Sequence, residues 1–241
     1  MKPIVEMRDI FLNYHSKDGE VAAVAGINLR VFKGEFVSIV GPSGCGKSSL
    51  LSVIAGLLPP SAGEILVEEK IGYMLQKDHL FPWRSILSNV LLGLEIQKKK
   101  CEKNVEYAHQ LLEKYGLGEF KKHRPKELSG GMRQRAALIR TLATRPKILM
   151  LDEPFSALDY QTRLTVSNEM KAILNEEQVT SILVTHDIAE SIALSDRVVV
   201  LSNRPAKVKN IHHINLEGEG RKSPKFPEYF NKIWKELKED G

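Results

Sequence analysis

The stretch GPSGCGKS at residues 41–48 fits the pattern G-x-x-x-x-G-K-[ST], in which a glycine-rich loop cradles phosphate groups. It directly follows an apolar run, Phe36–Val40, and opens a helical pattern that starts near Lys47. Glycines let the chain turn so tightly that successive backbone N–H groups point into one concavity. The start of the helix adds its positive dipole end. The stretch therefore predicts a strand–loop–helix unit that binds the phosphates of a nucleotide.

Individual side chains of this loop have distinct expected roles. Lys47 is a compact cation for the β- and γ-phosphates, and the Ser48 hydroxyl is placed to ligate Mg²⁺. We hypothesise that the positive potential of the loop lowers the pKa of Cys45 and gives a thiol that bound ATP would shield. The expected binding residues of the loop are Gly41, Pro42, Ser43, Gly44, Cys45, Gly46, Lys47, Ser48 and Ser49.

The composition is that of an ordinary globular protein, with 42% hydrophobic and 27% charged residues among 241. This length allows one large domain or one domain with an insert. No apolar run reaches about 18 residues, and the first residues lack the apolar core of a signal peptide, so we expect a cytosolic protein. The net charge of +5 could suit an anionic partner, but a solvated lysine-rich surface is the simpler explanation. The two cysteines, Cys45 and Cys101, form neither a disulfide framework nor a paired metal-ligand spacing.

Apolar runs and helical patterns alternate along the chain, which favours an α/β fold with a largely parallel sheet. The expected strands are Ile27–Val31, Phe36–Val40, Ile148–Leu151, Ser181–Thr185 and Arg197–Ser202. The expected helices are Lys47–Ala55, Glu102–Tyr115, Met132–Ala143, Thr162–Glu176 and Ile188–Leu194. Between about 77 and 145 helical periodicity dominates, so a helical insert divides the sheet in sequence.

The C-terminal region carries one more amphipathic pattern, which predicts a helix over 226–238 packed on the main domain. Binding of a partner is the alternative use of this helix. The residues expected to share its apolar face are Phe226, Phe230, Ile233, Trp234 and Leu237. Before it, His212 and His213 are expected in a strand, where neighbours point to opposite faces, which argues against a shared metal.

A pair of acidic residues, Asp152 and Glu153, directly follows the apolar run Ile148–Leu151. A phosphate-loop site needs a carboxylate to hold Mg²⁺, usually at the end of a neighbouring buried strand. Asp152 would hold the metal, directly or through water. Glu153 would then polarise the attacking water as a general base.

A second glycine-rich turn, Ser129-Gly130-Gly131, also opens a helix. Its backbone amides, serine hydroxyl and helix start form a second anion site, although serine and glycine are also typical of a simple helix cap. One nucleotide does not need two such cradles from one chain. We therefore expect each cradle to complete the site of another copy.

Together these segments resemble the ATP-binding subunit of an ATP-binding cassette (ABC) transporter over nearly the whole chain. Gly41–Ser49 is similar to the family's Walker A loop, and Leu128–Gln134 is similar to its signature motif. Ile148–Glu153 resembles Walker B, and Ser156–Asp159 resembles the D-loop. The segments occur in the family's order.

Single residues match the family as well. Gln76, after the strand Ile71–Met74, resembles the Q-loop glutamine that touches Mg²⁺ or water, and His186 resembles the switch histidine that senses the γ-phosphate. Tyr14 resembles the aromatic residue that stacks on adenine. The resemblance implies catalytic roles for Glu153, His186, Lys47 and Gln76, and metal binding by Ser48, Gln76 and Asp152. It extends the nucleotide contacts beyond the loop to Tyr14, Gln76, Ser129, Gly130, Gly131, Gln134 and Asp159.

The resemblance also implies a fold, a reaction and partners. The fold would be the ABC ATPase architecture, a P-loop NTPase (RecA-like) mixed sheet core with an antiparallel edge sheet and a helical subdomain. Within one domain spanning 1–241, the core would comprise 1–76 and 146–241, and the helical subdomain 77–145. Two copies would pair head to tail around ATP as an Mg-dependent ATPase. Transmembrane permease subunits, and indirectly a substrate-binding protein, would be partners at the inner face of the cell membrane, and nucleic acid is not expected.

A narrower resemblance, to the nitrate/sulfonate/taurine branch of importer ATPases, is carried by 80–84, 88–90 and 201–208. It implies import of a small anion or organic solute. Phe81, Pro82 and Trp83 would seat a coupling helix of the membrane subunits, unless Phe81 and Trp83 belong to the core. Two departures from the family are Ser49, where threonine is commoner, and a short segment from Ser61 to Gln76.

Two other classes of function compete with transport. A soluble ABC-type ATPase of chromosomes or repair would insert a long coiled coil between Ser49 and Leu128, and the chain is too short there. Translation-type relatives carry two cassettes, and this chain has one. A scaffold or assembly factor that does not hydrolyse ATP would be more credible if Glu153 or His186 were replaced, and both are present.

Overall fold

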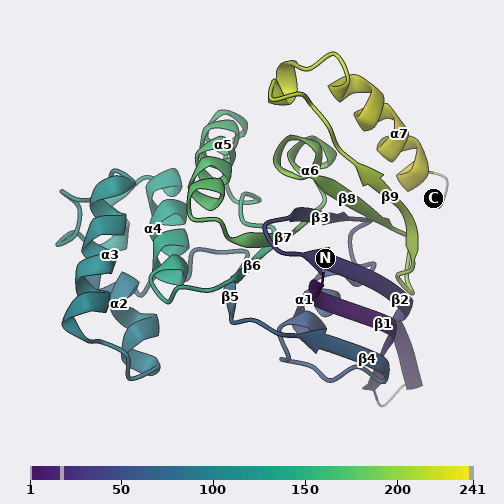
Figure 1. The fold of residues 1–241 in the computed structure, drawn as a ribbon, viewed down its shortest axis with the longest axis horizontal. Coiled ribbons are helices and arrows are strands. Elements are labelled where there is room, and N and C mark those ends of the chain that lie inside the picture. Colours follow the sequence, from purple (N-terminus) through teal and green to yellow (C-terminus); the bar gives the residue numbers. More distant parts are fainter. Residues whose placement is uncertain (1, 17–18, 239–241) are drawn as a thin grey trace. The chain divides into compact units, whose positions relative to one another are not determined.

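The elements of the chain fall into two units. The terminal unit comprises residues 1–69 and 180–241, and the middle unit comprises residues 70–179. The structure is a computed structural model that describes residues 2–16 and 19–238 (Figure 1). The glycine-rich loop belongs to the terminal unit, whereas Asp152 and Glu153 belong to the middle unit. The subdomain boundaries expected from the sequence stay a prediction.

In the terminal unit a parallel sheet surrounds β3 (Phe36–Val40), the strand that leads into the glycine-rich loop. Its neighbours are β7 (Thr180–Thr185) and β8 (Arg197–Leu201), both parallel to it, and β9 (Val208–His213) runs antiparallel to β8. Every residue of β3, β7 and β8 is buried. This explains why these strands read as continuous apolar runs, since strands covered on both faces have no solvated side.

A second, antiparallel sheet of the terminal unit has the order β2-β1-β4. Its strands are β1 (Pro3–Ser16), β2 (Gly19–Phe32) and β4 (Ala62–Val67). In β2 the buried Ile27, Leu29 and Val31 alternate with exposed residues, because successive side chains point to opposite faces. This sheet confirms the expected antiparallel edge sheet, although only Ile27–Val31 carried a strand signal.

Three helices accompany these sheets: α1 (Lys47–Ile54), α6 (Ile188–Leu194) and α7 (Phe226–Lys238). In α7 the fully buried residue is Ile233, which packs with Val40, Val198 and Val200 of the parallel sheet. A helix thus covers the range expected from the sequence, and its buried residue lies against the sheet. The prediction for Trp234 was wrong: it is 43% exposed, and the Lys238 ammonium lies 4.1 Å from the centre of its ring. A short 3₁₀ turn, Gly220–Lys222, precedes α7.

His212 and His213 lie in β9, as expected, with His212 buried and His213 exposed. His212 Nε2 lies 2.9 Å from Glu236 Oε2, and Asn210 Nδ2 donates to Glu236 Oε1 at 2.9 Å. His212 therefore joins β9 to α7 through Glu236.

The middle unit has two parallel strands and four helices. The strands are β5 (Ile71–Met74) and β6 (Ile148–Asp152), paired from Ile71 with Ile148 to Met74 with Leu151. The helices are α2 (Ile86–Ile96), α3 (Glu102–Lys114), α4 (Gly130–Leu142) and α5 (Tyr160–Glu176), and a 3₁₀ turn spans Pro125–Glu127. α4 contacts the other three helices, and its residues from Ala136 to Ile139 are completely buried.

Both the fold class and most element positions agree with the sequence. The α/β class with a mixed sheet, an antiparallel sheet and a helical segment is confirmed. β3, β5, α6 and α7 have the predicted bounds, and the other predicted helices and strands shift by one or two residues, apart from β2. β1, β4 and β9 were not among the strands read from apolar runs.

Candidate nucleotide-binding site

The glycine-rich loop joins β3 to α1, as the sequence predicts. Gly44 has φ 74° and Gly46 has φ 125°, backbone conformations that side-chain-bearing residues rarely adopt. A Cβ atom at Gly46 would also lie 2.7 Å from the carbonyl oxygen of Ala23. The loop is therefore restricted to glycine at this point for two independent reasons.

Lys47 opens α1 and is only 5% exposed. Its Nζ donates to the carbonyl oxygens of Gly41 at 2.9 Å and Pro42 at 2.8 Å, so the ammonium is held over the loop itself. Ser48 is exposed beside it. A cation held over the loop and an exposed hydroxyl are groups that a nucleotide polyphosphate and its metal ion require.

Tyr14 lies at this loop although it comes from β1. Its hydroxyl donates to Ser49 Oγ at 2.9 Å, and its ring is 40% exposed. An exposed aromatic ring next to the loop can cover the base of a nucleotide whose phosphates the loop holds. The structure thus brings Tyr14, which is distant in sequence, together with Ser49.

The hypothesis about Cys45 was wrong. Its side chain is 1% exposed, and burial raises the pKa of the thiol above its ordinary value, although the nearby Lys47 charge opposes this. Desolvation disfavours the thiolate more strongly than the ammonium favours it. Cys45 is therefore a packing residue beneath Gly41, whose added Cβ would lie 2.9 Å from the cysteine sulfur.

His186 follows the last residue of β7 and is exposed. β7 and β3 are parallel neighbours in which Thr185 pairs with Val40. Val40 precedes Gly41, and Thr185 precedes His186. The loop and the histidine therefore follow two adjacent strands at their carboxyl ends, on the same side of the sheet. In doubly wound sheets ligands bind at the carboxyl ends of the strands, which is where both features lie.

The acidic pair stands at the end of β6 in the middle unit. Tyr73 of β5 donates its hydroxyl to Asp152 Oδ2 at 3.2 Å, and burial, together with the Asp152 charge, raises the pKa of Tyr73 well above its ordinary value. Tyr73 therefore remains a proton donor that orients one carboxylate oxygen of Asp152. This contact could not be expected from the sequence.

Glu153 has φ 44°, an uncommon conformation for a residue with a side chain. Strained backbone of this kind clusters at functional sites. Gln76 approaches it, with Nε2 3.5 Å from Glu153 Oε2 and 3.3 Å from Ser156 Oγ. The structure thus brings Gln76 and Glu153 together from segments 77 residues apart.

The second cradle is a helix start at which Ser129 is exposed and Gly131 is buried. Ser129 is the N-cap of α4, and its Oγ accepts from the backbone N–H of Met132 at 3.3 Å. A Cβ at Gly131 would lie 2.8 Å from Val166 Cγ2, so glycine lets α4 approach α5 closely here. Gln134 is 3% exposed, and a contact with nucleotide would require its side chain to leave the interior.

Asp159, in the segment resembling the D-loop, is the N-cap of α5. Its carboxylate accepts from the backbone N–H of Thr162 at 3.0 Å, and hydrogen bonds from Thr162 lower the pKa of Asp159. The charge of this exposed carboxylate complements the dipole of the helix.

The segment after Gln76 is held by residues that sequence reasoning did not single out. Arg133 Nε donates to Asp78 Oδ2 at 3.1 Å, and Arg140 donates to the carbonyl oxygens of Asp78 at 2.8 Å and His79 at 2.7 Å. Both arginines belong to α4, which starts at the second cradle. The only signal in the sequence is that two arginines follow the Ser-Gly-Gly turn at helical spacing.

Asn89 of α2 holds the other end of this segment. It is fully buried, accepts from the backbone N–H of Phe81 at 2.7 Å and donates to the carbonyl oxygens of Phe81, Arg84 and Ser85. Trp83 stacks on Phe81 with ring centroids 5.0 Å apart, yet it is 67% exposed. The alternative that both rings belong to the core is therefore wrong for Trp83.

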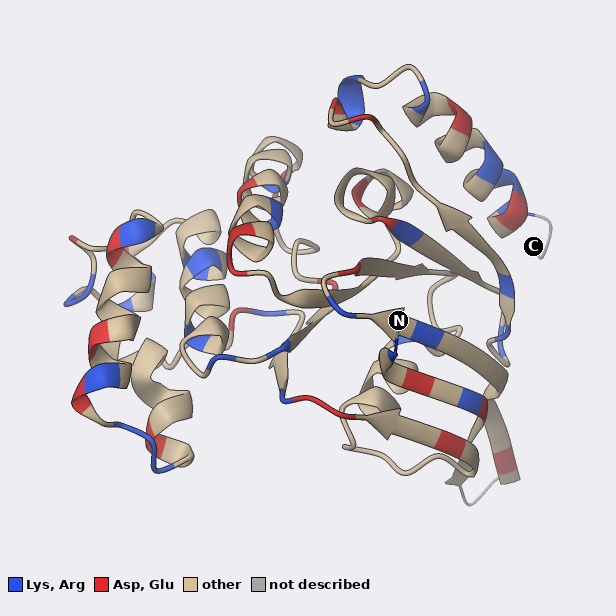
Figure 2. Cartoon of the chain, in the orientation of Figure 1, with Lys and Arg blue, Asp and Glu red and all other residues tan. Residues whose placement is uncertain are grey.

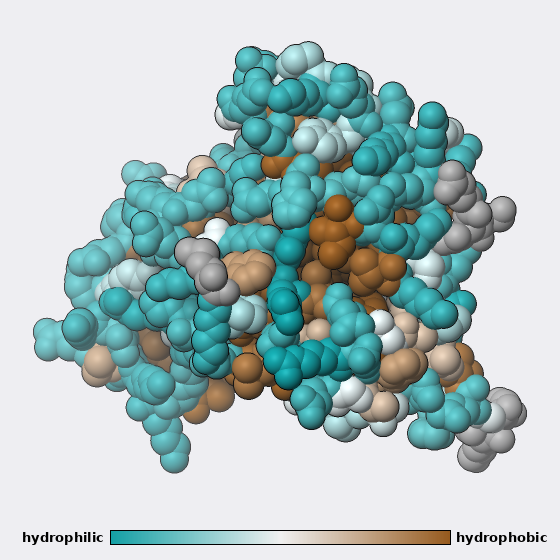
Figure 3. Space-filling view, turned by 45° about the vertical axis from the view of Figure 1, so that its right-hand side comes forward, coloured by the Kyte–Doolittle hydropathy of each residue, from teal (hydrophilic) through white to brown (hydrophobic). Residues whose placement is uncertain are grey.

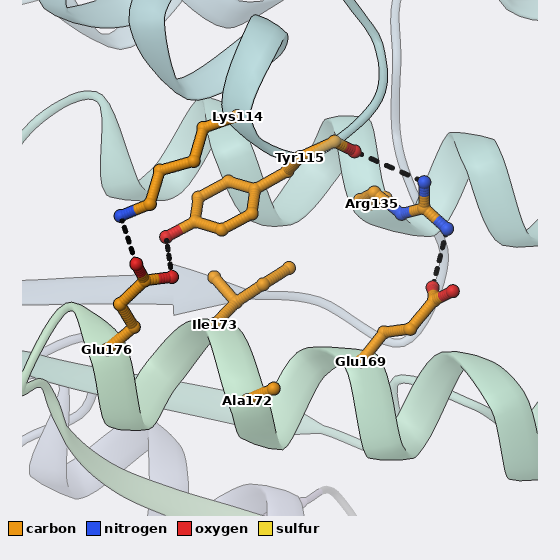
Figure 4. A pocket seen from close by; sticks show the side chains of 7 residues that line it. All are labelled: Lys114, Tyr115, Arg135, Glu169, Ala172, Ile173 and Glu176. Carbon is orange, nitrogen blue, oxygen red and sulfur yellow. Dashed lines mark hydrogen bonds and ion pairs between the residues drawn. The ribbon is translucent and has the colours of Figure 1, made fainter.

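A hollow of about 460 Å³ opens on the middle unit (Figure 4). Its lining residues are Lys114, Tyr115, Arg135, Glu169, Ala172, Ile173 and Glu176. The charged groups are paired with one another: Lys114 lies 3.0 Å from Glu176, and Arg135 binds both Glu169 and the carbonyl oxygen of Tyr115. None of the predicted site residues lines this hollow, whose ion pairs join α3 and α4 to α5.

The surface carries charges of both signs. Basic and acidic residues are interspersed along α3 and α7 in Figure 2. The face seen in Figure 3 is mostly hydrophilic, with restricted hydrophobic patches. Across residues 2–16 and 19–238, no helix combines the length and the apolar character needed to cross a membrane.

Comparison with known proteins identifies the family. The family model described as "ABC transporter" matches residues 24–156, which include the loop Gly41–Ser49 and the acidic pair. The chain belongs to the ABC transporter family. It is an ATP-binding subunit and an ATPase of this family.

Curated relatives of the ABC family match nearly the full chain. An "Uncharacterized ABC transporter ATP-binding protein YtlC" of Bacillus subtilis is 50% identical, covering 93% of this chain and 92% of its own length. The nitrate import ATP-binding protein NrtD of Synechocystis is 40% identical over 89% of this chain and 84% of its own. The aliphatic sulfonates import ATP-binding protein SsuB of Bacillus cereus is 36% identical over 98% and 97%.

A solved ABC cassette has the same fold. The dimeric bacterial ABC transporter cassette MJ0796 matches with a TM-score of 0.74 and 31% identity, covering 88% of this chain and 99% of its own. The predicted ABC ATPase fold is thereby confirmed.

Proposed function

We propose that two copies of the chain hydrolyse ATP between them and so drive the import of a small anion through membrane subunits. The loop Gly41–Ser49 of one copy and Ser129–Gly131 of the other would hold the same nucleotide. The observation that carries the proposal is the pairing of Val40 with Thr185. Because of this pairing, the loop and His186 follow adjacent parallel strands at the same end of the sheet. The dimeric state of the 31% identical cassette supports the pairing of copies.

The residues at the two cradles would have different roles in ATP binding and hydrolysis. Lys47 and the loop amides would neutralise the β- and γ-phosphates, and Tyr14 would cover the adenine. Glu153 would orient and deprotonate the attacking water, since a carboxylate within reach of water can act as general base. The remaining roles are metal or water positioning by Gln76, γ-phosphate sensing by His186, and contacts to the nucleotide of the other copy by Ser129, Gly130, Gly131, Gln134 and Asp159.

The side chains expected to hold Mg²⁺ fit that ion. The Ser48 hydroxyl, the Asp152 carboxylate and the Gln76 amide all offer oxygen, which Mg²⁺ prefers, usually together with substrate phosphates and water. No group of three or more His, Cys, Asp or Glu side chains in the described part of the chain could hold a metal alone. These three side chains therefore suit a Mg²⁺ ion that binds together with the nucleotide and neutralises the charge of its phosphates.

Membrane subunits are the proposed partners, and they would hold the chain at the inner face of the cell membrane. Trp83 supports this, because a large aromatic ring that is 67% exposed and stacked on Phe81 forms a rigid apolar contact. Asn89 fixes the backbone on which the two rings stand. A substrate-binding protein would deliver the solute to the membrane subunits.

The proposed cargo is a small anion or organic solute of the nitrate, sulfonate or taurine kind. The names of NrtD and SsuB, at 40% and 36% identity, support this class. The test is growth of a strain that lacks the gene, with an alkanesulfonate or taurine as the only sulfur source, or nitrate as the only nitrogen source. Loss of growth on one of these, restored by the wild-type gene but not by Lys47→Ala, is the expected result.

Normal growth of the deletion strain on all three nutrients would show that the cargo class is wrong. The ATPase activity is tested separately, by phosphate release from ATP with the purified chain. Co-purification from detergent-solubilised membranes tests the partnership, and recovery of the chain without any membrane protein would count against it.

A further inference from the structure

The hydroxyl of Thr185, the last residue of β7, bridges two groups that follow it in sequence. Thr185 Oγ1 donates to Glu190 Oε2 at 2.9 Å, and it accepts from the backbone N–H of Asp187 at 3.0 Å. Thr185 is 2% exposed and Glu190 is 3% exposed, so both bonds lie in the interior of the terminal unit. A single hydroxyl therefore ties the end of a strand to the first turn of α6.

His186 lies inside this set of bonds. On its N-terminal side Thr185 is fixed in the sheet by its pairing with Val40. On its C-terminal side Asp187 caps α6, its Oδ1 accepting from the backbone N–H of Glu190 at 3.0 Å. The bond from the Asp187 N–H to the Thr185 hydroxyl is an ST-turn that spans the histidine. The backbone of His186 is consequently held from both sides.

The histidine side chain itself is exposed and turns about only two bonds, so its backbone decides where the imidazole can reach. The cap of α6 is made by the Asp187 carboxylate and the backbone N–H of Glu190, so it does not need the side chain of Thr185 or of Glu190. A carboxylate that is almost fully buried is costly unless it is hydrogen-bonded, and Thr185 supplies such a bond. A valine would fill the volume of Thr185 equally well but could make neither bond.

We propose that Thr185 and Glu190 are positioning residues that hold the imidazole of His186 at the γ-phosphate of ATP. This inference rests on the proposed role of His186 and adds to it the pair that fixes the histidine. The pair touches neither nucleotide nor metal; it acts through the backbone of the histidine.

Two substitutions at one position test the proposal in the purified full-length chain. Thr185→Val keeps the shape and removes both bonds, whereas Thr185→Ser keeps the hydroxyl. We expect Thr185→Val to lower kcat for ATP hydrolysis on the order of tenfold to a hundredfold, since a displacement of about 1 Å has such effects. KM for ATP should be unchanged because Lys47 and the loop are untouched, and Thr185→Ser should restore most of the turnover.

A double-mutant cycle shows whether the effect passes through the histidine. In a His186→Ala background, Thr185→Val should change kcat by less than about twofold. If the two effects multiply instead, or if Thr185→Val and Thr185→Ser lose the same activity, the positioning role is overturned while the role of His186 stands. If His186→Ala alone leaves kcat unchanged, the role of His186 fails, and the positioning pair fails with it.

Glu190→Met provides a second route, needed if Thr185→Val does not fold. Methionine fills a similar volume and cannot accept the Thr185 hydrogen. It should lower kcat, leave KM unchanged and lose this effect in the His186→Ala background. A folded Glu190→Met protein with wild-type kcat would overturn the proposal.

Discussion

Arg140 of α4 donates from Nη1 to the carbonyl oxygen of His79 at 2.7 Å, across 61 positions of sequence. Its Nη2 donates to the carbonyl oxygen of Asp78 at 2.8 Å. His79 has φ 44°, so the arginine stabilises a turn that the backbone alone disfavours. α4 and the segment after Gln76 are therefore joined within the middle unit by the guanidinium group of Arg140.

Substitution of Arg140 should destabilise this turn. Arg140→Ala leaves two carbonyl oxygens without their charged donor, and we expect a loss of about 1.5–3 kcal/mol in the free energy of unfolding. Arg140→Lys should lose part of this, because one ammonium lacks the fork that reaches two successive carbonyls. Urea denaturation measures both, with exposed Lys122→Ala as the control. Equal stability of Arg140→Ala and the control would contradict the role given to this contact.

Lys47→Ala should weaken ATP binding. The loss of a charge-assisted contact to phosphate corresponds to on the order of tenfold to a hundredfold in affinity. Titration with a fluorescent ATP analogue measures the change. Lys33→Ala removes an exposed lysine of the same unit and should bind as the wild type does. Affinities of the two variants within twofold of each other would remove Lys47 from the phosphate site.

Glu153→Gln should retain ATP without turning it over. An amide of the same shape cannot take a proton from water, and the loss of a general base costs about 10²–10⁴ in rate. Two copies should then remain closed around ATP, which sedimentation analysis detects as a dimer. Glu119→Gln, an exposed acid of the middle unit, is the control. Full turnover by Glu153→Gln would exclude this residue as the base.

The stability of the middle unit should depend on pH through Glu177. Burial raises the pKa of this carboxyl, but hydrogen bonds from Tyr115, Lys114 and Tyr107 outweigh it and hold the pKa below the ordinary value of 4.5. A depressed pKa means that the folded state binds the proton less well than the unfolded state does. The contribution is therefore present above pH 4.5 and is lost as the pH falls through the folded value.

Glu177→Gln measures this contribution directly. The difference in unfolding free energy between the wild type and Glu177→Gln should be largest near neutral pH and should shrink in acid. Glu119→Gln should show no such trend. A difference that stays constant from neutral pH to pH 3 would mean that the charge of Glu177 contributes nothing.

Trp83→Ser should weaken the association with membrane subunits. The ring offers a large apolar area that serine lacks, and such anchors carry much of the binding energy of an interface. Ile96→Ser is the matched control, because Ile96 is another apolar side chain of the middle unit and is 73% exposed. Co-purification from solubilised membranes measures the effect. Equal recovery of membrane protein with both variants would place the contact elsewhere.

Short-range features could be predicted from the sequence. Phe36–Val40, the loop and α1 follow one another without a break, and both the strand run and the glycines are local signals. β1 could not be predicted in this way. Its pairing with β2 and β4 is interrupted by bulges, and Gly63, whose added Cβ would lie 2.1 Å from the carbonyl oxygen of Asp9, fits only at one such irregularity. Cross-strand partners, rather than a periodic pattern, hold this strand.

Contacts between distant segments could not be predicted from the sequence either. Asp152 was identified from the sequence, but its hydrogen bond with Tyr73 was not. His186 was identified as well, but the hydrogen bond between Thr185 and Glu190 beside it was not. The errors have a similar cause. Positive charge near Cys45 was visible in the sequence, whereas its burial was not, and burial decides its pKa. Helical spacing placed Trp234 beside Ile233, but only Ile233 reaches the sheet.

The contrast between the two cysteines has a practical consequence. Cys45 is enclosed beneath the loop, whereas Cys101 stands exposed before the first residue of α3. A maleimide-linked spin label or fluorophore would attach to the natural sequence at one position per copy. In a pair of copies the two labels would give one intermolecular distance, and its change over a round of ATP hydrolysis could be followed without altering a single amino acid.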